Sequence, residues 1–196
     1  MRRRAGQVDQ TRQRIVEATV ELHGSVGPAA TTIAAIADRA GVTRLTVYRH
    51  FPDDAALFAA CSAHWASRQQ LPDPAAWSGI DDPAARLRAG LADLYRFYRA
   101  GAGMLTHIHR DLAALPEAHQ QALRDGDTLA RDVLTAPFDR ASDQRRQLRA
   151  AIGHAISFWT WRSLCLDQGL TDTEAAEAMT GMILAITPLP HAEPAR

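Results

Sequence analysis

The sequence predicts an all-α protein with two helical domains, and three observations carry this expectation. Apolar residues recur at the 3.6-residue spacing of helices along most of the chain. Beyond Cys61, nothing alternates between apolar and polar residues as a half-buried strand does. Prolines and glycines interrupt the apolar stripes as helix breakers do. We expect an N-terminal three-helix domain over residues 1–53 and a C-terminal helical domain over residues 54–196.

The chain is long enough to form a core in each of these domains. It has 196 residues, of which 46% are hydrophobic. No apolar run is long enough to cross a membrane and no signal peptide is apparent, so we expect a cytoplasmic protein. Cys61 and Cys165 lack the spacing of a metal site, and we expect both to be reduced and buried.

The N-terminal domain is expected to begin with two amphipathic helices. Each has largely apolar residues at positions i, i+3, i+4 and i+7, which form one stripe on a helix. The stripes consist of Ile15, Ala18, Thr19 and Leu22 in the first helix and Ile33, Ile36, Ala37 and Ala40 in the second. Thr31 or Thr32 supplies the N-cap of the second helix. Gly41 follows its stripe directly, where helices often end in a left-handed residue that glycine adopts without steric cost.

A third helix is expected after Thr43, which can cap its N-terminus. Val47 and Phe51 would point inward and pack against the other two helices. The positions left available to solvent or to a partner are Arg44, Leu45, Thr46, Tyr48, Arg49 and His50. Folding alone does not require this combination of exposed arginine, aromatic and apolar side chains.

These side chains suit a nucleic-acid surface. Arginine pairs with guanine edges or phosphates, Thr and Tyr hydroxyls reach phosphate oxygens, and Leu45 can meet a thymine methyl. Two helices hinged at a glycine, with such residues on the second, form the layout of a DNA-reading helix-turn-helix. The candidate DNA contacts are the six exposed residues of the third helix together with Thr31 and Thr32. From the pattern alone, an ordinary helical hairpin with a solvated face is the alternative.

The stretch from Gln10 to Cys61 resembles the N-terminal signature of the tetracycline-repressor (TetR) family. The matching elements are Thr31-Thr32, Ile36-Ala37, Ala40-Gly41-Val42-Thr43 and Val47-Tyr48-Arg49-His50-Phe51. Leu57 and Phe58 match the start of the helix that links the two domains in such proteins. The resemblance implies a transcriptional regulator that binds double-stranded DNA at a palindromic operator as a homodimer and responds to a small-molecule effector.

One position departs from this family. Its members usually carry a lysine shortly after the recognition helix, whereas this chain reads Pro52-Asp53-Asp54, so an expected phosphate contact is missing. We expect Asp54 to cap the next helix. The cluster Arg2, Arg3 and Arg4 is expected to compensate as a mobile arm that follows the DNA backbone or enters the minor groove.

Charge is distributed unevenly along the chain. The formal net charge is zero, yet residues 1–51 contain eight arginines and only four acidic residues. The basic surface is therefore local, as expected for a DNA-binding domain attached to a regulatory body, and we expect the protein to associate with the nucleoid.

In the C-terminal domain the sequence predicts a connecting helix over residues 54–70 and a loop through Trp77. Asp82 and Pro83 look like a cap and a first-turn proline. The helix that they open has Leu87, Leu91, Leu94, Tyr95 and Tyr98 on one face. A shorter helix follows Gly103, and another, opened by Pro116, ends before residue 137.

Two final helices are expected over residues 142–168 and 171–186, and both are unusually apolar. Their broad stripes predict packing against their own domain and against a second copy, through a four-helix bundle. The predicted dimer interface consists of Leu148, Ile152, Ile156, Met179, Met182 and Ile183.

The resemblance also implies an effector cavity in the C-terminal domain. The residues in the corresponding helices suggest an apolar, partly aromatic pocket for a small hydrophobic or aromatic molecule. They are Tyr95, Tyr98, Met104, His107, Ile108, His154, Phe158, Trp159 and Trp161. The alternative is that most of them belong to the core or to the dimer interface.

Nothing in the sequence supports catalysis, a metal or a cofactor. His107 and His109 are two residues apart, so on a helix they point in different directions, and no carboxylate or Cys completes a metal site. No catalytic triad spacing, phosphate loop or dinucleotide fingerprint is present. An all-α enzyme that uses His107, His109 or His154 is a weak rival hypothesis.

The sequence therefore predicts a ligand-responsive transcriptional repressor that is released from its operator by an effector. Some members of the family activate transcription, and the sequence does not choose between the two. The alternative is a helical protein that binds a ligand or a partner and whose DNA-binding head is weakened, as Asp54 suggests.

Overall fold

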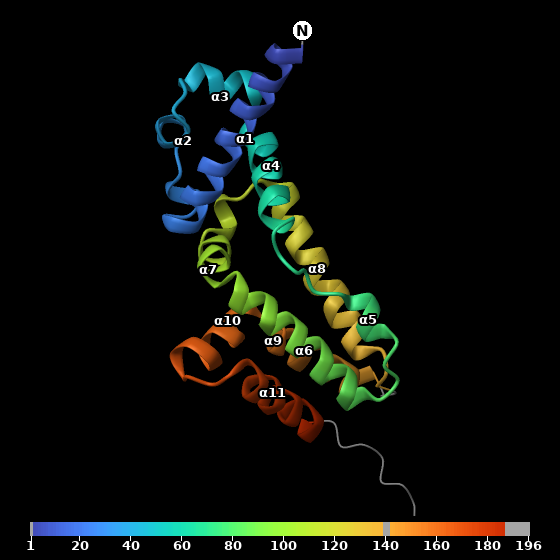
Figure 1. The fold of residues 1–196 in the computed structure, drawn as a ribbon. Coiled ribbons are helices and arrows are strands. Elements are labelled where there is room, and N and C mark those ends of the chain that lie inside the picture. Colours follow the sequence, from blue (N-terminus) through green and yellow to red (C-terminus); the bar gives the residue numbers. More distant parts are fainter. Residues whose placement is uncertain (1, 139–141, 187–196) are drawn as a thin grey trace, which may run out of the picture. The chain divides into compact units, whose positions relative to one another are not determined.

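The computed structural model describes residues 2–138 and 142–186, and every regular element in this part of the chain is a helix (Figure 1). The predicted all-α fold class is confirmed. Contacts between residues divide the chain into two compact units. Unit 1 comprises Met1–Leu71 and Ala100–Leu123, and unit 2 comprises Pro72–Arg99 and Arg124–Arg196. The domain boundary predicted after residue 53 separates a DNA-binding domain from an effector-binding domain. This functional division stays a prediction.

Unit 1 is organised around its first helix. Its elements are α1 (Arg2–Ser25), η1 (Pro28–Ala30), α2 (Ile33–Ala40), α3 (Arg44–His50), α4 (Asp54–Ala66), α7 (Ala102–Arg110), η2 (Leu112–Ala114) and the first turns of α8 (Glu117–Thr135). Helix α1 packs against α2, α4 and α7, and α3 packs against α2. The core includes six residues of the two predicted stripes, together with Val47, Phe51, Leu57 and Cys61. Of the other two stripe residues, Thr19 is buried but polar, and Ile33 is partly buried and packs against this core. The apolar spacing in the sequence therefore identified the packed faces correctly.

Within unit 1, polar contacts join the end of α7 to the turn that follows α1. Arg110 donates a hydrogen bond to the carbonyl of Val26 at 2.8 Å, and the backbone N–H of Ala29 donates to the Asp111 carboxylate at 3.1 Å. Gly27, at φ 94°, lies between these contacts, and a Cβ atom there would collide with both the Arg110 and Asp111 side chains. The turn and the end of α7 are therefore held together.

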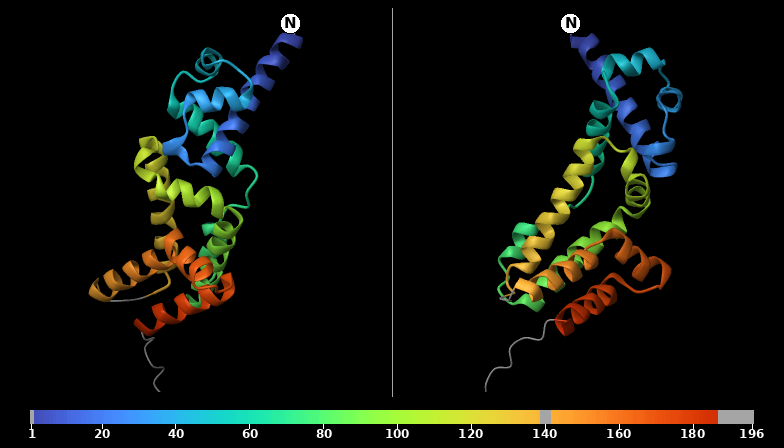
Figure 2. Two further views of the ribbon diagram at one scale, coloured as in Figure 1. Left: turned by 90° about the vertical axis from the view of Figure 1, so that its left-hand side faces the viewer. Right: turned by 180° about the vertical axis from the view of Figure 1, so that it is seen from behind.

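Unit 2 contains the remaining helices. They are α5 (Pro74–Ser78), α6 (Pro83–Ala100), the rest of α8, α9 (Ser142–Ala155), α10 (Phe158–Arg162), the π-helical turn η3 (Ser163–Asp167) and α11 (Asp172–Ile186). Helices α9 and α11 pack against each other (Figure 2). The buried guanidinium of Arg86 donates to the carbonyls of Ser78, Ile80 and Val133. These bonds offset the cost of burying its charge and join α8 to the segment before α6.

Two boundaries near the start of unit 2 differ from those predicted. Helix α4 ends at Ala66 rather than at Gln70. Trp77 lies in the short helix α5 rather than in a loop. Asp73 caps that helix, and the Trp77 indole donates to the Asp93 carboxylate at 3.0 Å, which holds it against α6.

The long penultimate helix predicted from the sequence is interrupted. Helix α9 ends at Ala155, and α10 begins at Phe158. The Tyr95 hydroxyl donates to the carbonyl of Ala155 at 2.8 Å, and the Tyr98 hydroxyl donates to that of Ile156 at 2.7 Å. Tyrosines from α6 thus satisfy carbonyls that a break in the helix would otherwise leave unpaired.

Most of the predicted dimer interface lies inside a single copy of the chain. Leu148, Ile152, Ile156, Met179 and Ile183 are at most 6% exposed, because α9 and α11 use their apolar faces within unit 2. Of the predicted set, only Met182 is exposed, at 58%. An interface with a second copy would therefore use other residues of these helices.

Candidate nucleic-acid interface

A tight turn joins α2 to α3. Gly41 is in the left-handed conformation that the sequence predicted, at φ 66° and ψ 41°. Its N–H donates to the carbonyl of Asp38 at 3.2 Å, and the N–H of Val42 donates to that of Ala37 at 2.9 Å. This Schellman arrangement satisfies carbonyls at the end of α2 and fixes the direction in which the chain leaves it.

Thr43 then starts α3, because its hydroxyl accepts a hydrogen bond from the N–H of Thr46 at 3.2 Å. One face of α3 is anchored in the core: Val47 is fully buried and Phe51 is 3% exposed. The guanidinium of Arg12 on α1 lies 4.8 Å from the centre of the Phe51 ring, close enough for a cation–π contact. The orientation of α3 is therefore fixed at both ends.

The opposite face of α3 projects into solvent. Leu45 is 78% exposed and Tyr48 is 51% exposed, and both Arg44 and Arg49 are exposed as well. Within the described part of the chain, the Arg44, Tyr48 and Arg49 side chains form no hydrogen bond or ion pair. Two unpaired guanidinium groups, a phenol and an apolar side chain on one rigid helix can contact phosphates and base edges.

The other predicted DNA-contact residues also have structural roles. Thr31 donates its hydroxyl to the carbonyl of Gly27 at 2.8 Å, and Thr32 caps α2. The hydroxyl of Thr46 is hydrogen-bonded to that of the residue that caps α3. His50 is half-buried at the end of α3. The contribution of these four to DNA binding stays a prediction.

Two expectations about the edges of this surface were wrong. The cap of α4 is Asp53, whose carboxylate accepts from the N–H of Ala56 at 2.7 Å, whereas Asp54 is the exposed first residue of the helix. The arginines at residues 2–4 belong to the first turn of α1 rather than to a separate arm. Their side chains lie outside the described part of the structure.

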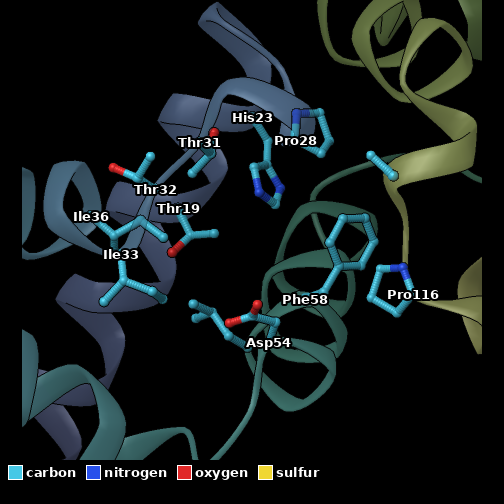
Figure 3. Close-up of a pocket in the computed structure, with 12 residues that line it drawn as sticks. Thr19, His23, Pro28, Thr31, Thr32, Ile33, Ile36, Asp54, Phe58 and Pro116 are labelled. Carbon is cyan, nitrogen blue, oxygen red and sulfur yellow. The ribbon is translucent and has the colours of Figure 1, made fainter.

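A cavity of about 290 Å³ lies within unit 1 (Figure 3). Its walls come from α1, η1, α2, α4 and the segment that runs from η2 to the start of α8. His23, Asp54, Phe58 and Pro116 contribute to its lining. The sequence did not reveal this cavity, because its residues come from segments that are far apart in the chain.

His23 in this cavity is buried and carries no charge at neutral pH. Burial lowers its pKa to about 4 by desolvating the imidazolium, and the attraction of Asp111 offsets this only in part. Its Nδ1 lies 3.6 Å from the Sγ of Cys61, and its ring lies against Phe58 at 5.2 Å between centres. Burial also raises the pKa of the Cys61 thiol to about 12, so the thiol is protonated as well.

The residues predicted to line an effector pocket are divided between the two units. Tyr95, Tyr98, Phe158 and Trp161 form a buried aromatic cluster in unit 2, with Tyr98 5.5 Å from Phe158 and 5.9 Å from Trp161 between ring centres. Burial raises the pKa of both tyrosine phenols, which therefore remain hydrogen-bond donors. The remaining residues of the predicted effector set lie outside this cluster. His154 and Trp159 are exposed in unit 2, and Met104, His107 and Ile108 are on α7 in unit 1.

The described residues also bear on metal binding and on membrane insertion. Among those that the structure describes, no group of three or more His, Cys, Asp or Glu side chains is placed to hold a metal ion. None of the described helices is long and apolar enough to span a membrane.

Comparison with known proteins gives an independent view of the helix-turn-helix. Residues 15–61 match the family described as bacterial regulatory proteins, tetR family. This segment runs from the core of α1 through α2 and α3 into α4. No curated protein sequence matches the chain.

Solved structures resemble the chain over most of its length. A TetR-family regulator from Streptomyces coelicolor has a TM-score of 0.61 at 20% identity, covering 91% of this chain and 80% of its own. PfmR from Thermus thermophilus has a TM-score of 0.59 at 20% identity, covering 88% and 97%. NalD of Pseudomonas aeruginosa, the secondary repressor of the MexAB-OprM multidrug efflux pump, has a TM-score of 0.57 at 22% identity, covering 90% and 96%. Residues 15–61 thus match the tetR family of bacterial regulatory proteins, and the chain shares the helical fold of these TetR-family regulators.

Proposed function

We propose that this protein is a transcriptional repressor that binds a palindromic DNA operator as a homodimer and leaves it when a small molecule binds. The observation that supports this best is the geometry of α3. Its inner face is locked by Val47 and Phe51, while Arg44, Leu45, Tyr48 and Arg49 project outward. A rigid helix with this outer face can enter a major groove without rearranging.

Two copies are needed for useful specificity, because one recognition helix reads only a few base pairs. A two-fold dimer would place two α3 helices about 34 to 36 Å apart, which matches successive major grooves on one side of the duplex. Exposed apolar side chains on the last helices, Met182 and Ile186 of α11 and Trp159 of α10, offer surface for such an association.

The effector is proposed to be a small hydrophobic or aromatic molecule. The cluster of Tyr95, Tyr98, Phe158 and Trp161 supports this proposal, because aromatic side chains provide large apolar contacts. Binding that favours a second arrangement of the dimer would change operator affinity by roughly 5 to 150-fold for a coupling of about 1 to 3 kcal/mol. Repression rather than activation is favoured by the fold shared with NalD, which is a repressor.

Selection from a pool of random duplex DNA by the purified full-length protein tests the proposal. At about 0.15 M salt, purely electrostatic binding is suppressed. The expected result is an enriched palindrome whose half-sites are about one helical turn apart. A variant with both Arg44→Ala and Arg49→Ala should enrich nothing, since both residues lie on the exposed face and are not needed for the core.

The exposed acidic residue at the start of α4 favours a second candidate function. Asp54 adds a negative charge at the start of α4, four residues beyond the end of α3. This arrangement would suit a helical protein that binds a ligand or a partner and whose DNA-binding head is weakened. Selection that enriches no sequence, by protein that is folded and free of ligand, would favour this candidate over the repressor.

A further inference from the structure

The cavity in unit 1 is small and is lined by both apolar and polar groups. Ile33, Ile36, Leu57 and Phe58 provide its apolar walls (Figure 3). Its volume of about 290 Å³ lies just below the range for ligand pockets, which is about 300 to 1,000 Å³. A molecule with one ring or a short chain fits this space.

Most polar groups that line the cavity can only accept hydrogen bonds. Thr19 already donates its hydroxyl hydrogen to the carbonyl of Ile15 at 2.8 Å, and Thr31 donates to that of Gly27 at 2.8 Å. Their remaining capacity is the lone pairs on oxygen. A ligand that binds here should therefore bring hydrogen-bond donors.

The charge of the lining has one sign at neutral pH. Asp54 is the only one of the twelve lining residues that is charged, because His23 is neutral and no Lys or Arg contributes. Within the described residues, the Asp54 carboxylate has no hydrogen-bond or ion-pair partner. Figure 3 shows it at the edge of the cavity, across from His23 and beside the apolar wall. It is therefore available to a cationic group.

We propose that this cavity binds a small organic cation whose ammonium group pairs with Asp54 and whose apolar part packs against Phe58. Such a molecule suits the small space with apolar walls, the hydrogen-bond acceptors and the negative charge of the cavity. The ammonium group supplies several donors to acceptor groups and a positive charge to an unpaired carboxylate. The apolar part fills a space that holds a single ring. This site is separate from the aromatic cluster of unit 2.

The site also has a consequence for DNA binding, and this part rests on the proposed function. Asp54 lies four residues beyond His50, the last residue of α3, and its negative charge would repel phosphates bound beside that helix. A bound cation neutralises that charge, so it should strengthen DNA binding. The effect has the opposite sign to the release expected from an effector in unit 2.

Binding can be tested without DNA, using 2-phenylethylamine as the cationic probe and 2-phenylethanol as its neutral analogue. Backbone NMR shifts of the isotopically labelled full chain at pH 7 report the site. The amine should shift the amides of Thr31, Asp54 and Phe58. Asp54→Asn should weaken binding of the amine about fivefold, as expected for an exposed ion pair, and should leave binding of the alcohol unchanged. Asp38→Asn, an exposed carboxylate of the same unit outside the cavity, should change neither.

A second pair of variants tests the location. Ala114 is exposed and lines the cavity, whereas its neighbour Ala113 is exposed and does not. Ala114→Trp should fill the space and abolish binding of both probes, and Ala113→Trp should retain it. Any of three results would overturn the proposal. The first is the absence of shifts from the amine up to its solubility limit, and the second is equal affinity of the amine for Asp54→Asn and the original chain. The third is an equal loss of probe binding in both tryptophan variants.

Operator affinity measured with and without the amine then tests the consequence for DNA. The expected result is tighter binding by the original chain and no change for Asp54→Asn. Binding of the amine without any effect on DNA would overturn the regulatory part and leave the site itself established. Failure of the protein to bind any DNA sequence would instead count against the proposed function. It would not affect the cation site, because the NMR experiment contains no DNA.

Discussion

Arg44 occupies the first turn of the recognition helix, where it is exposed and forms no hydrogen bond or ion pair with other described residues. Arg44→Ala should lower affinity for the selected operator by about 1 to 3 kcal/mol and relax preference at one base pair, if Arg44 pairs with a guanine. Fluorescence anisotropy with the operator and its single-base variants measures this. Arg145→Ala, which removes an equal charge from α9, is the control. Equal weakening on every sequence would make Arg44 a phosphate contact.

Asp54 should oppose DNA binding, because it places an exposed negative charge shortly after α3. Asp54→Lys should strengthen binding and steepen the dependence of affinity on salt, because it replaces a repulsive charge by a phosphate contact. Anisotropy at a series of salt concentrations gives both quantities. Asp81→Lys makes the same charge change on an exposed residue of unit 2 and should alter neither. An unchanged salt slope in Asp54→Lys would show that this position does not meet the phosphates.

His23 should make unit 1 sensitive to mild acid. Its folded-state pKa of about 4 lies below the unfolded value of 6.5, so the unfolded chain binds a proton first as the pH falls. Its contribution is present above pH 6.5 and is lost on acidification toward pH 4, amounting to about 2 kcal/mol between pH 7 and pH 5. Urea unfolding at several pH values should show this loss. His23→Gln should flatten the dependence, and an equally steep one would assign it to other groups.

At the scale of elements, the turn between α2 and α3 determines how the recognition helix leaves the core. Gly41 has a φ of 66°, where a residue with a Cβ atom costs about 1 to 2 kcal/mol. Gly41→Ala should therefore lower the free energy of unfolding by that amount and weaken operator binding. Gly103→Ala on α7 is the matched control, because its φ is not positive and its Cβ would meet nothing within 4 Å. Similar losses in both variants would contradict this role for the turn.

These elements also show what local sequence can predict. The ends of α2 and the start of α3 were predicted correctly because Thr32, Gly41 and Thr43 act on the backbone of their own neighbours. The break between α9 and α10 was missed, since the hydroxyls that stabilise it come from Tyr95 and Tyr98 in another helix. Helix propensity and apolar spacing carry no information about such a partner.

At the scale of the whole molecule, the fold was predictable from local sequence patterns, whereas the sites depend on contacts between distant segments. Helical periodicity and the Gly-Val-Thr motif were sufficient for the all-α class and for the helix-turn-helix. The cavity beside Asp54 was not predictable, because five segments must fold together to form it. The predicted dimer residues stay a prediction for a related reason: a broad apolar stripe does not reveal which part of it is covered within the same chain, as the buried Ile152 and Ile183 show.

Met182 provides a test of the proposed dimer. It is 58% exposed on α11, so Met182→Arg should leave the fold intact and place a charge in the interface. Sedimentation should then show monomers and anisotropy a loss of operator binding, while the circular dichroism spectrum is unchanged. Leu71→Arg, 52% exposed in unit 1, should remain dimeric. A dimer that persists in Met182→Arg would place the interface elsewhere.

The anchoring of α3 has a consequence for how this protein can diversify. The residues that hold the helix, Thr43, Val47 and Phe51, are distinct from the outward-facing Arg44, Leu45, Tyr48 and Arg49. Substitution on the outer face therefore carries little penalty for stability. Under the proposed function, DNA-sequence preference can drift, or be re-engineered by exchanging these four side chains, while the scaffold that presents them stays constant.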